Sequence, residues 1–421
     1  MNILLLGAGG REHALACKLA QSPLCKQLFI GPGNTGTAQY GVNIAMDIMN
    51  FEVVSSFANE NKIDLIVVGP DDPVCGGAYD FLTKRGFKTF APSREAAKLE
   101  GSKSYAKEFM MRHQIPTASY LEVTKENLAE GIAHLRQCKP PYVLKADGLA
   151  AGKGVLILHN TEQAERELRG MIEESKFGDA GSKVVIEDFL DGIEFSVFVV
   201  TDGVDYKILP NAKDYKRVGE GETGLNTGGM GAISPVPFVD DLLMKKVEER
   251  IIKPTIDGFV KDGLTYKGFV YFGLIKVGDE PMVIEYNCRM GDPETEVVMP
   301  RLKNDLVQLI MSCFDGTLGE IVIEEDERAC CTVVLTSGGY PEHFEKNKVV
   351  SGLDIEDKEI MVFHAGMKKS GDEMLTSGGR VMMISSFGSD IKQALANSLR
   401  AAERIQFEKK YFRKDIGFEF L

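Results

Sequence analysis

The sequence predicts a protein of several domains that combine α/β and α+β folds. Its 421 residues exceed what one hydrophobic core usually supports and correspond to roughly two to four domains. Within residues 1–100, continuous apolar runs alternate with helical patterns, which indicates a parallel sheet with helices on both faces. After residue 313 the pattern changes to several strands followed by a helix, as in a small α+β domain.

Residues 1–102 form the first predicted domain, a doubly wound parallel sheet. Each predicted strand is a short apolar run that ends in a loop containing Gly or Pro, and a helical pattern covers residues 13–21. The predicted strands cover residues 2–6, 27–30, 64–68 and 88–90. In sheets of this kind ligands bind at the carboxyl ends of the strands, so the loops are candidates for the binding site.

The first of these loops, Gly7-Ala-Gly-Gly-Arg-Glu-His13, starts like a dinucleotide-binding fingerprint and then departs from it. The last position of G-x-G-x-x-G holds Glu12, a bulky acid that would crowd the helix against the strand and oppose a pyrophosphate. A helix N-terminus still binds a single phosphate well. The loop therefore favours a phosphate monoester over NAD, and a tight structural turn is the other alternative.

The central part of the chain contains a glycine-rich loop between two predicted strands, at residues 142–145 and 155–158. The loop, Asp147-Gly-Leu-Ala-Ala-Gly-Lys-Gly154, is not a P-loop, because Asp147 occupies the first Gly position and a strand follows instead of a helix. Such a loop is predicted to be a flexible flap whose N–H groups and Lys153 close on phosphates. The alternative is a mobile surface hairpin.

Further central segments are predicted from their patterns. Glu187 and Glu194 bracket a Gly-containing connector that leads into a strand at residues 195–200, although solvated acids explain these two residues equally well. Residues 219–231 form a long glycine-rich loop, and loops of this length inside a domain are usually functional. Helical patterns cover residues 101–136 and 242–259.

The stretch around residue 285 carries the clearest chemistry. A strand at residues 269–277 and the next strand are predicted to form a hairpin through Gly278-Asp279. Side chains alternate along a strand, so Glu285, Asn287 and Arg289 share one face. Carboxylate and amide oxygens suit Mg²⁺, and a guanidinium grips an anion. A half-exposed edge strand with solvated charges is the alternative.

The C-terminal part, residues 329–421, is predicted to be a separate small α+β domain with no visible catalytic cluster. Its predicted strands cover residues 329–336, 361–367 and 381–386, and its predicted helix covers residues 391–404.

Composition and charge exclude several classes of protein. The chain is 44% hydrophobic and 26% charged, as ordinary globular proteins are. Its net charge of −13 argues against a general nucleic-acid surface, and no apolar run is long enough to span a membrane. No signal-peptide pattern follows Met1, and none of the eight cysteines forms a C-x-x-C pair. We expect a cytoplasmic monomer that binds neither nucleic acid nor membranes.

Taken together, an ordered set of motifs resembles the phosphoribosylamine–glycine ligase family, the glycinamide ribonucleotide synthetases of the ATP-grasp superfamily. Each motif alone is weak or moderate, but the ordered set is specific and extends along the whole chain. The matching stretches are residues 7–14, 32–34, 69–70, 99–103, 145–154, 226–231, 284–289, 291–295, 338–341 and 413–417.

The resemblance implies three domains and a reaction. It implies an N-terminal domain at residues 1–102, an ATP-grasp domain at 103–328 with a mobile lid at about 124–193, and a C-terminal domain at 329–421. It implies that ATP and Mg²⁺ or Mn²⁺ drive the ligation of glycine to 5-phospho-β-D-ribosylamine through a glycyl phosphate, in de novo purine synthesis. Arg289, Lys145 and Asp214 are the expected catalytic residues.

The resemblance also implies ligand contacts, which stay expectations at this point. ATP is expected to contact Lys103, Lys145, Gly152, Lys153, Gly154, Glu187, Phe189, Leu190 and Glu194. The metal is expected on Glu285 and Asn287. The other substrates are expected to contact Gly9, Gly10, Arg11, Asn34, Asp214, Gly229, Arg289, Asp292 and Thr295. Arg289 would bind the glycine carboxylate, and either Asp214 or Asp292 would accept its ammonium group.

The chain departs from the family pattern at three places. Tyr215 stands where the family often has His, and Leu225 replaces a frequent Pro. Residues 269–276 lack the acid that many ATP-grasp enzymes carry on this strand, so phosphates and water would have to complete the metal shell. Two rival functions stay open at this stage: another ATP-grasp ligase, and a nucleotide-binding sensor without catalysis.

Overall fold

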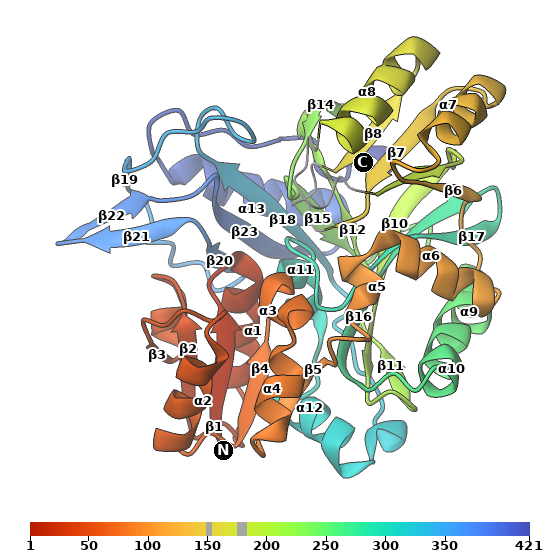
Figure 1. Ribbon diagram of the computed structural model, residues 1–421. Coiled ribbons are helices and arrows are strands. Elements are labelled where there is room, and N and C mark those ends of the chain that lie inside the picture. Colours follow the sequence, from red (N-terminus) through yellow and green to blue (C-terminus); the bar gives the residue numbers. More distant parts are fainter. Residues whose placement is uncertain (149–153, 175–182) are drawn as a thin grey trace.

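A computed structural model describes residues 1–148, 154–174 and 183–421, and in these residues one nine-stranded sheet joins the N-terminal and central parts of the chain (Figure 1). The strand order is β11-β10-β16-β5-β4-β1-β2-β3, and β17 also pairs with β16. The strands are β1 (Asn2–Gly7), β2 (Gln27–Pro32), β3 (Val42–Asn43), β4 (Leu65–Val68), β5 (Thr89–Pro92), β10 (Ile193–Thr201), β11 (Tyr206–Ile208), β16 (Tyr266–Val277) and β17 (Glu280–Asn287).

The N-terminal half of this sheet confirms the predicted parallel arrangement. Strands β1, β2, β4 and β5 pair in parallel because each is an apolar run buried by helices on both faces. The helices are α1 (Gly10–Ala20), α2 (Phe51–Glu60), α3 (Asp71–Gly76) and α4 (Ala78–Lys84), with a 3₁₀ turn at Thr37–Gln39. The sheet then continues without a break, since Ala91 and Pro92 of β5 pair with Lys267 and Tyr266 of β16.

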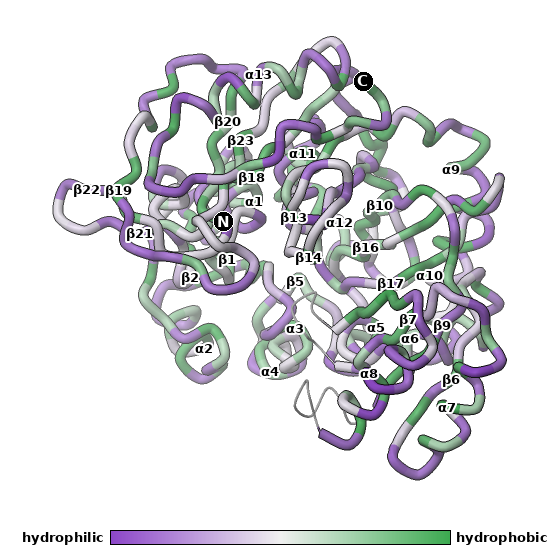
Figure 2. The backbone as a smooth tube through the Cα atoms, turned by 90° about the horizontal axis from the view of Figure 1, so that it is seen from above, coloured by the Kyte–Doolittle hydropathy of each residue, from purple (hydrophilic) through white to green (hydrophobic). Residues whose placement is uncertain are grey.

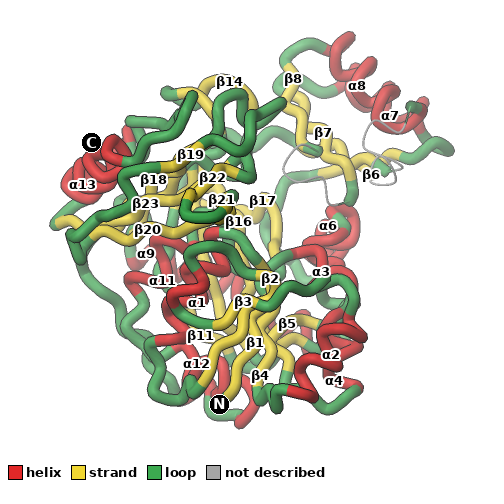
Figure 3. The backbone as a smooth tube through the Cα atoms, turned by 90° about the vertical axis from the view of Figure 1, so that its left-hand side faces the viewer, coloured by secondary structure: helices red, strands yellow, loops and turns green. Residues whose placement is uncertain are grey.

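A separate four-stranded antiparallel sheet projects from this body together with two helices, and we call it the four-stranded unit (Figure 3). It comprises β6 (Tyr120–Val123), α7 (Leu128–Gln137), β7 (Tyr142–Ala146), β8 (Val155–Leu158), α8 (Thr161–Glu173) and β9 (Val184–Glu187). It has its own hydrophobic core. The helical expectation for residues 101–136 is wrong at β6, because pairing with β9 makes this segment a strand. Helices α5 (Lys98–Gly101) and α6 (Lys103–Arg112) precede it.

The C-terminal domain contains a five-stranded sheet that includes two strands from the central part of the chain. Its order is β12-β15-β18-β23-β20, and α13 packs against it. These elements are β12 (Lys213–Asp214), β15 (Gly231–Ser234), β18 (Ala329–Thr336), β20 (Ile360–His364), β23 (Arg380–Gly388) and α13 (Ile391–Arg404). A three-stranded sheet projects at the left of Figure 1, formed by β19 (Val349–Val350), β21 (Met367–Ser370) and β22 (Glu373–Thr376).

Two predicted segments in this region differ from the structure. The strand expected at residues 361–367 ends at His364, and Met367 begins β21 in another sheet. The glycine-rich loop expected at residues 219–231 is partly ordered as a hairpin of β13 (Arg217–Gly219) and β14 (Thr223–Asn226), and it leads into β15. Backbone pairing across the fold imposed these strands on a sequence that has few β-formers.

The remaining helices complete the body. Helices α9 (Asp241–Val247) and α10 (Lys253–Lys261) are joined by a π-helical segment (Glu248–Ile252), which matches the predicted helix at 242–259. The others are α11 (Thr295–Arg301), α12 (Leu306–Asp315) and short 3₁₀ turns at Leu318–Glu320 and Phe418–Phe420. Hydrophobic segments follow the inner strands β10, β16 and β17 in Figure 2. Among the described helices, each is too short or too polar to span a membrane.

Candidate active site

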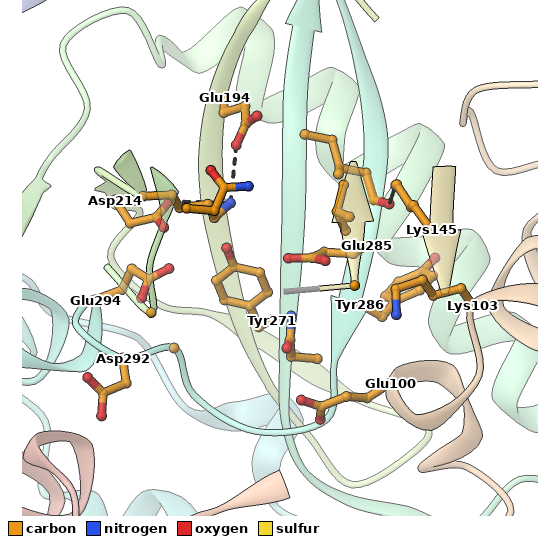
Figure 4. Close-up of a pocket in the computed structure, with 18 of the residues that line it drawn as sticks. Glu100, Lys103, Lys145, Glu194, Asp214, Tyr271, Glu285, Tyr286, Asp292 and Glu294 are labelled. Atoms are coloured by element: carbon orange, nitrogen blue, oxygen red, sulfur yellow. Dashed lines mark hydrogen bonds and ion pairs between the residues drawn. The ribbon is translucent and has the colours of Figure 1, made fainter. Parts of the chain in front are cut away.

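A cavity of about 730 Å³ lies where the four-stranded unit, the central sheet and the C-terminal domain meet (Figure 4). Its walls come from β7 to β10, β12 to β14, β16 and β17. Arg11 of the N-terminal domain and Arg380 of β23 also line it. Ligand pockets commonly form where domains meet, so this cavity is the candidate active site.

Strand β17 supplies the middle of the cavity. Glu285 and Asn287 line it, as strand alternation predicts, and Arg289 lines it from two residues beyond the end of the strand. Tyr286 of the same strand also lines it. A β-bulge at Gly273 of β16 leaves Ile284 as the extra residue, so Ile284 lines the cavity as well. In Figure 4 Glu285 lies between two groups of charged side chains, with Lys103 and Lys145 on one side.

We call the first group, Lys103, Lys107, Lys145 and Glu187, the lysine end. Glu187 of β9 is ion-paired with Lys145 at 2.9 Å and with Lys107 at 3.2 Å, and all three side chains are buried. Lys145 also donates to the carbonyl oxygen of Ile284 at 3.3 Å. Among the described residues, Oε1 of Glu187 has no hydrogen-bond partner. A buried acceptor without a partner is costly, which points to a ligand donor at this position.

The first turn of α6 positions Lys103 beside Gly148. Ser102 caps this helix by accepting from Tyr105 N at 3.2 Å, and Asp147 accepts from Ser104 N at 2.7 Å. Lys103 donates to the carbonyl oxygen of Gly148 at 3.1 Å. Burial lowers the pKa of Lys103, and it lowers the pKa of Lys107 to about 8. Because desolvation disfavours these cations, a polyanionic ligand would stabilise them.

Lys216 lies between two acids on the opposite wall. Its Nζ is 3.1 Å from Glu194 of β10 and 3.7 Å from Asp214 of β12. Burial lowers the pKa of Lys216, but Asp214 and Glu194 outweigh burial and hold this pKa well above its usual value. The lysine therefore stays charged and links the two acids.

The second group, Asp214, Asp292, Glu294 and Arg380, is the carboxylate end. Asp214 and Glu294 lie next to each other across the cavity from the two labelled lysines (Figure 4). Burial, followed by the charge of Asp214, raises the pKa of Glu294 to about 8. Asp292 is ion-paired with Arg380 at 3.0 Å, and its Oδ2 accepts from Arg11 N at 3.4 Å. Asp292 thus has one ion pair and one hydrogen bond, although its Oδ1 has no hydrogen-bond partner among the described residues.

Arg289 is held by a buried acid at the end of β17. Its guanidinium is 2.8 Å from Glu100 of α5, and it donates to the carbonyl oxygen of Met290 at 3.2 Å. Burial lowers the pKa of Arg289, but Glu100 reverses this effect and raises it, so the side chain stays charged.

The first loop has a different arrangement from the one expected. Glu12 accepts from Gly9 N at 2.7 Å and from Arg11 Nε at 2.6 Å, so it caps α1. The predicted crowding by Glu12 is wrong, because Gly7 and Gly69 leave room: a Cβ on either would lie 2.3 Å from the Glu12 side chain. Asn34 is buried and donates to three carbonyl oxygens around this loop.

Several other expected contact residues lie away from the cavity lining. Of the loop residues Gly9, Gly10, Arg11 and Asn34, it is Arg11 that lines the cavity. The expected residues outside the lining are Gly9, Gly10, Asn34, Phe189, Leu190, Gly229 and Thr295. Phe189 is 40% exposed, whereas Thr295 is buried and donates to the carbonyl oxygen of Gly291.

The glycines expected at the site have different roles. Gly229 has φ +114° and a Cβ there would lie 2.3 Å from Pro293 Cδ, so close packing against Pro293 accounts for this glycine. Gly154 lines the cavity, and its carbonyl oxygen accepts from Ala146 N at 2.8 Å. Gly152 and Lys153 lie outside the described residues.

Sequence reasoning assigned no role to several charged or polar cavity residues, among them Glu100, Lys107, Lys216, Tyr271 and Arg380. One local signal was available, because Lys107 lies one helical turn after Lys103. Arg380 comes from the C-terminal domain, in which no catalytic cluster was visible. Tyr215, by contrast, donates to Glu419 at 2.7 Å and is buried in the core.

Glu285 and Asn287 fit a divalent cation by the chemistry of their oxygens. Their neighbours across the hairpin are Gly273 and Tyr271, so β16 adds no carboxylate here. The described residues contain no group of three or more His, Cys, Asp and Glu side chains that could hold a metal ion alone. Two protein oxygens suit a cation that completes its shell with phosphates and water.

Three family models match nearly the whole chain. The Phosphoribosylglycinamide synthetase N domain matches residues 1–100, the ATP-grasp (A) domain matches 101–295, and the C domain matches 330–419. A phosphoribosylamine–glycine ligase of Haemophilus influenzae is 44% identical over 99% of this chain and 98% of its own length. One from Escherichia coli (strain K12) is 45% identical with the same coverage.

Solved structures agree with these matches. A phosphoribosylamine–glycine ligase from Thermotoga maritima superposes with a TM-score of 0.86 at 36% identity, covering 99% of this chain and 100% of its own. A biotin carboxylase from Campylobacter jejuni, solved as a complex with β,γ-ATP, superposes with a TM-score of 0.73 at 15% identity, covering 99% and 94%. This second likeness shows that the ATP-grasp fold is shared.

Proposed function

The chain belongs to the phosphoribosylglycinamide synthetase family, and we propose that this cavity is where glycine is joined to 5-phospho-β-D-ribosylamine. It is an ATP-dependent carbon–nitrogen ligase of purine biosynthesis. The observation that carries the detailed assignment is the order of groups along the cavity in Figure 4: Lys103 and Lys145 at one end, Glu285 in the middle, and Asp214, Asp292 and Glu294 at the other end.

The reaction needs an activated carboxylate. A carboxylate oxygen of glycine attacks the γ-phosphorus of ATP, the bond to the bridging oxygen breaks, and ADP leaves. The amine nitrogen of the ribosylamine then attacks the carbonyl carbon of glycyl phosphate, inorganic phosphate leaves, and the nitrogen loses a proton. Such transfers depend on positioning and charge neutralisation and need no protein nucleophile.

The lysine end fits ATP. Glu187 Oε1, which has no partner among the described residues, would accept from the adenine amino group, and Lys103 and Lys145 would neutralise phosphates. Glu194, at the other side of this region, would bind the ribose hydroxyls. The four-stranded unit would act as the lid, and its closure would exclude water from the reacting phosphoryl group.

Glu285 and Asn287 would hold the divalent cation, which we take to be Mg²⁺ or Mn²⁺. When bound, such a cation neutralises phosphate charge and polarises the phosphoryl oxygen.

The carboxylate end fits the amines. Arg289 would bind the glycine carboxylate. Asp214 is the better candidate for the glycine ammonium group, because its contact with Lys216 is long, at 3.7 Å, whereas Asp292 lies 3.0 Å from Arg380 and also accepts from Arg11 N. Arg11, at the start of α1, would face the phosphate of the ribosylamine.

Omission of each substrate in turn tests this proposal. The full rate of ADP release should require ATP, glycine and the ribosylamine together. ADP release that is unaffected by leaving out glycine, or that proceeds equally with alanine or bicarbonate, would assign the cavity to another ligase. Nucleotide binding without ADP release would indicate a sensor.

A further inference from the structure

Glu100 is a buried acid beside the cavity that no substrate contact in the proposed mechanism uses. It lies in α5, three residues before Lys103, and 8% of its surface is exposed. Figure 4 shows it at the edge of the cavity below Glu285. Burial raises the pKa of Glu100, while Arg289 is the first of the groups that oppose this rise. Burying a charged carboxylate costs free energy, so Glu100 needs strong partners to stay ionised.

Both partners of Glu100 are consecutive residues at the end of β17. Its Oε2 accepts from Cys288 N at 2.7 Å, and its Oε1 lies 2.8 Å from the Arg289 guanidinium. The Met290 carbonyl oxygen accepts from the other terminal nitrogen of Arg289 at 3.2 Å. The planar guanidinium is therefore contacted from two sides before any ligand binds, by an ion pair with Glu100 and by a hydrogen bond to the Met290 carbonyl oxygen.

Fixed orientation matters because a guanidinium recognises a carboxylate through two parallel N–H donors. A freely rotating arginine would lose conformational entropy on binding, whereas a preset one loses little. Glycine is small, so this one contact makes up much of its recognition. The same short segment also carries Lys103 at the lysine end, so it sets the position of Arg289 relative to the ATP phosphates.

We propose that Glu100 is a positioning residue for glycine, which orients Arg289 through the contacts with Cys288 N and the guanidinium. The proposal rests on the assignment of Arg289 to the glycine carboxylate. Glu100 does not touch the substrate itself, so its removal should act on glycine only through Arg289.

Glu100→Gln tests this, because the amide keeps the shape and an acceptor for Cys288 N but removes the charge that holds Arg289. The KM for glycine should rise about tenfold, while the KM for ATP should stay within about twofold. Glu95→Gln is the matched control: Glu95 lies five residues earlier and is exposed, paired only with Lys98 at 2.7 Å among the described residues. It should leave both KM values unchanged.

A double-mutant cycle separates positioning from a general structural role. If Glu100 acts through Arg289, Glu100→Gln should add little to the glycine KM of Arg289→Lys, because coupled residues are not additive. If the two substitutions instead raise the glycine KM by independent factors that multiply, the proposal is overturned. An equal rise in the KM for ATP would overturn it as well. If Glu100→Gln does not fold, Glu100→Asp, which keeps the charge and shortens the reach, should show the same glycine-selective rise, and its absence would equally overturn the proposal.

The outcomes also separate this inference from the proposed function. If Arg289→Lys leaves the glycine KM unchanged, the assignment of Arg289 fails. If Arg289→Lys raises it and Glu100→Gln does not, only the positioning role of Glu100 fails.

Discussion

The lysine end and the carboxylate end of the cavity differ in how their charges are balanced. At the lysine end three lysines face one carboxylate, and two of them share it at 2.9 and 3.2 Å. At the carboxylate end three acids lie beside two cations, since Arg380 pairs with Asp292 and Lys216 lies 3.7 Å from Asp214. An excess of buried cations suits a polyanion such as ATP, and an excess of acids suits an amine. Under the proposed function, the two ends would therefore bind different reactants.

The proposed function assigns phosphate transfer to the middle of the cavity. Glu285 lies there, between the two ends (Figure 4), so phosphate would leave the nucleotide and reach the glycine carboxylate beside it. Substitutions in the middle should therefore affect turnover, and substitutions at either end should affect one reactant.

The largest loss of turnover is expected from Glu285→Gln, in the middle of the cavity. The amide keeps the size of the side chain but removes the charge that a divalent cation needs, so turnover should fall about a hundredfold or more. Glu280→Gln is the control, since Glu280 begins the same strand but is exposed and paired with Lys246. Steady-state rates across a Mg²⁺ titration measure both, and an active Glu285→Gln enzyme with normal Mg²⁺ dependence would remove Glu285 from the metal site.

The next largest effect is expected on the KM for glycine, from a substitution of Arg289. Arg289→Lys keeps the charge but loses the two-donor fork, and one charged hydrogen bond is worth roughly 1.5–3 kcal/mol. The KM for glycine should rise about tenfold or more, since about 1.4 kcal/mol corresponds to a factor of ten. A higher KM for ATP with unchanged glycine would instead assign Arg289 to the phosphates.

A smaller effect on the KM for glycine should distinguish Asp214 from Asp292, which were equivalent candidates in the sequence. Asp214→Asn should raise the glycine KM several-fold, whereas Asp292→Asn should raise it less, because Arg380 already occupies Asp292. The two variants are assayed side by side for glycine and for the ribosylamine. The reverse order would make Asp292 the ammonium acceptor.

The smallest effect is expected on the pH dependence of stability, through Glu294. The pKa of Glu294 is raised from 4.5 to about 8, so the folded state holds a proton that the unfolded state releases. Wild-type stability should therefore fall as pH rises from about 4.5 to about 8, relative to Glu294→Gln, which cannot ionise. Calorimetry should show the Tm of the variant gaining a few degrees on the wild type over this range. A constant difference between pH 5 and pH 8 would mean that Glu294 is ionised throughout.

Much of the architecture was predictable because its signals are local. Buried parallel strands read as short apolar runs, the hairpin of β16 and β17 is marked by Gly278-Asp279, and α13 has the bounds that its periodicity predicts. The failures were strands without a local signal. Segment β6 looked helical and is held by β9, and β15 emerges from a glycine-rich stretch because β18 pairs with it.

The motif order along the chain was enough to predict the family and the reaction, and strand alternation was enough to group Glu285 with Asn287, because these signals lie in neighbouring residues. The contacts between distant groups came from the folding of the chain: Glu100 with Cys288 N, 188 positions apart, and Asp292 with Arg380, 88 positions apart. Such pairs depend on how whole elements pack, and burial then changes their pKa values and their freedom to bind ligands. That is why Asp214 and Asp292 were equivalent candidates in the sequence and are not equivalent in the folded protein.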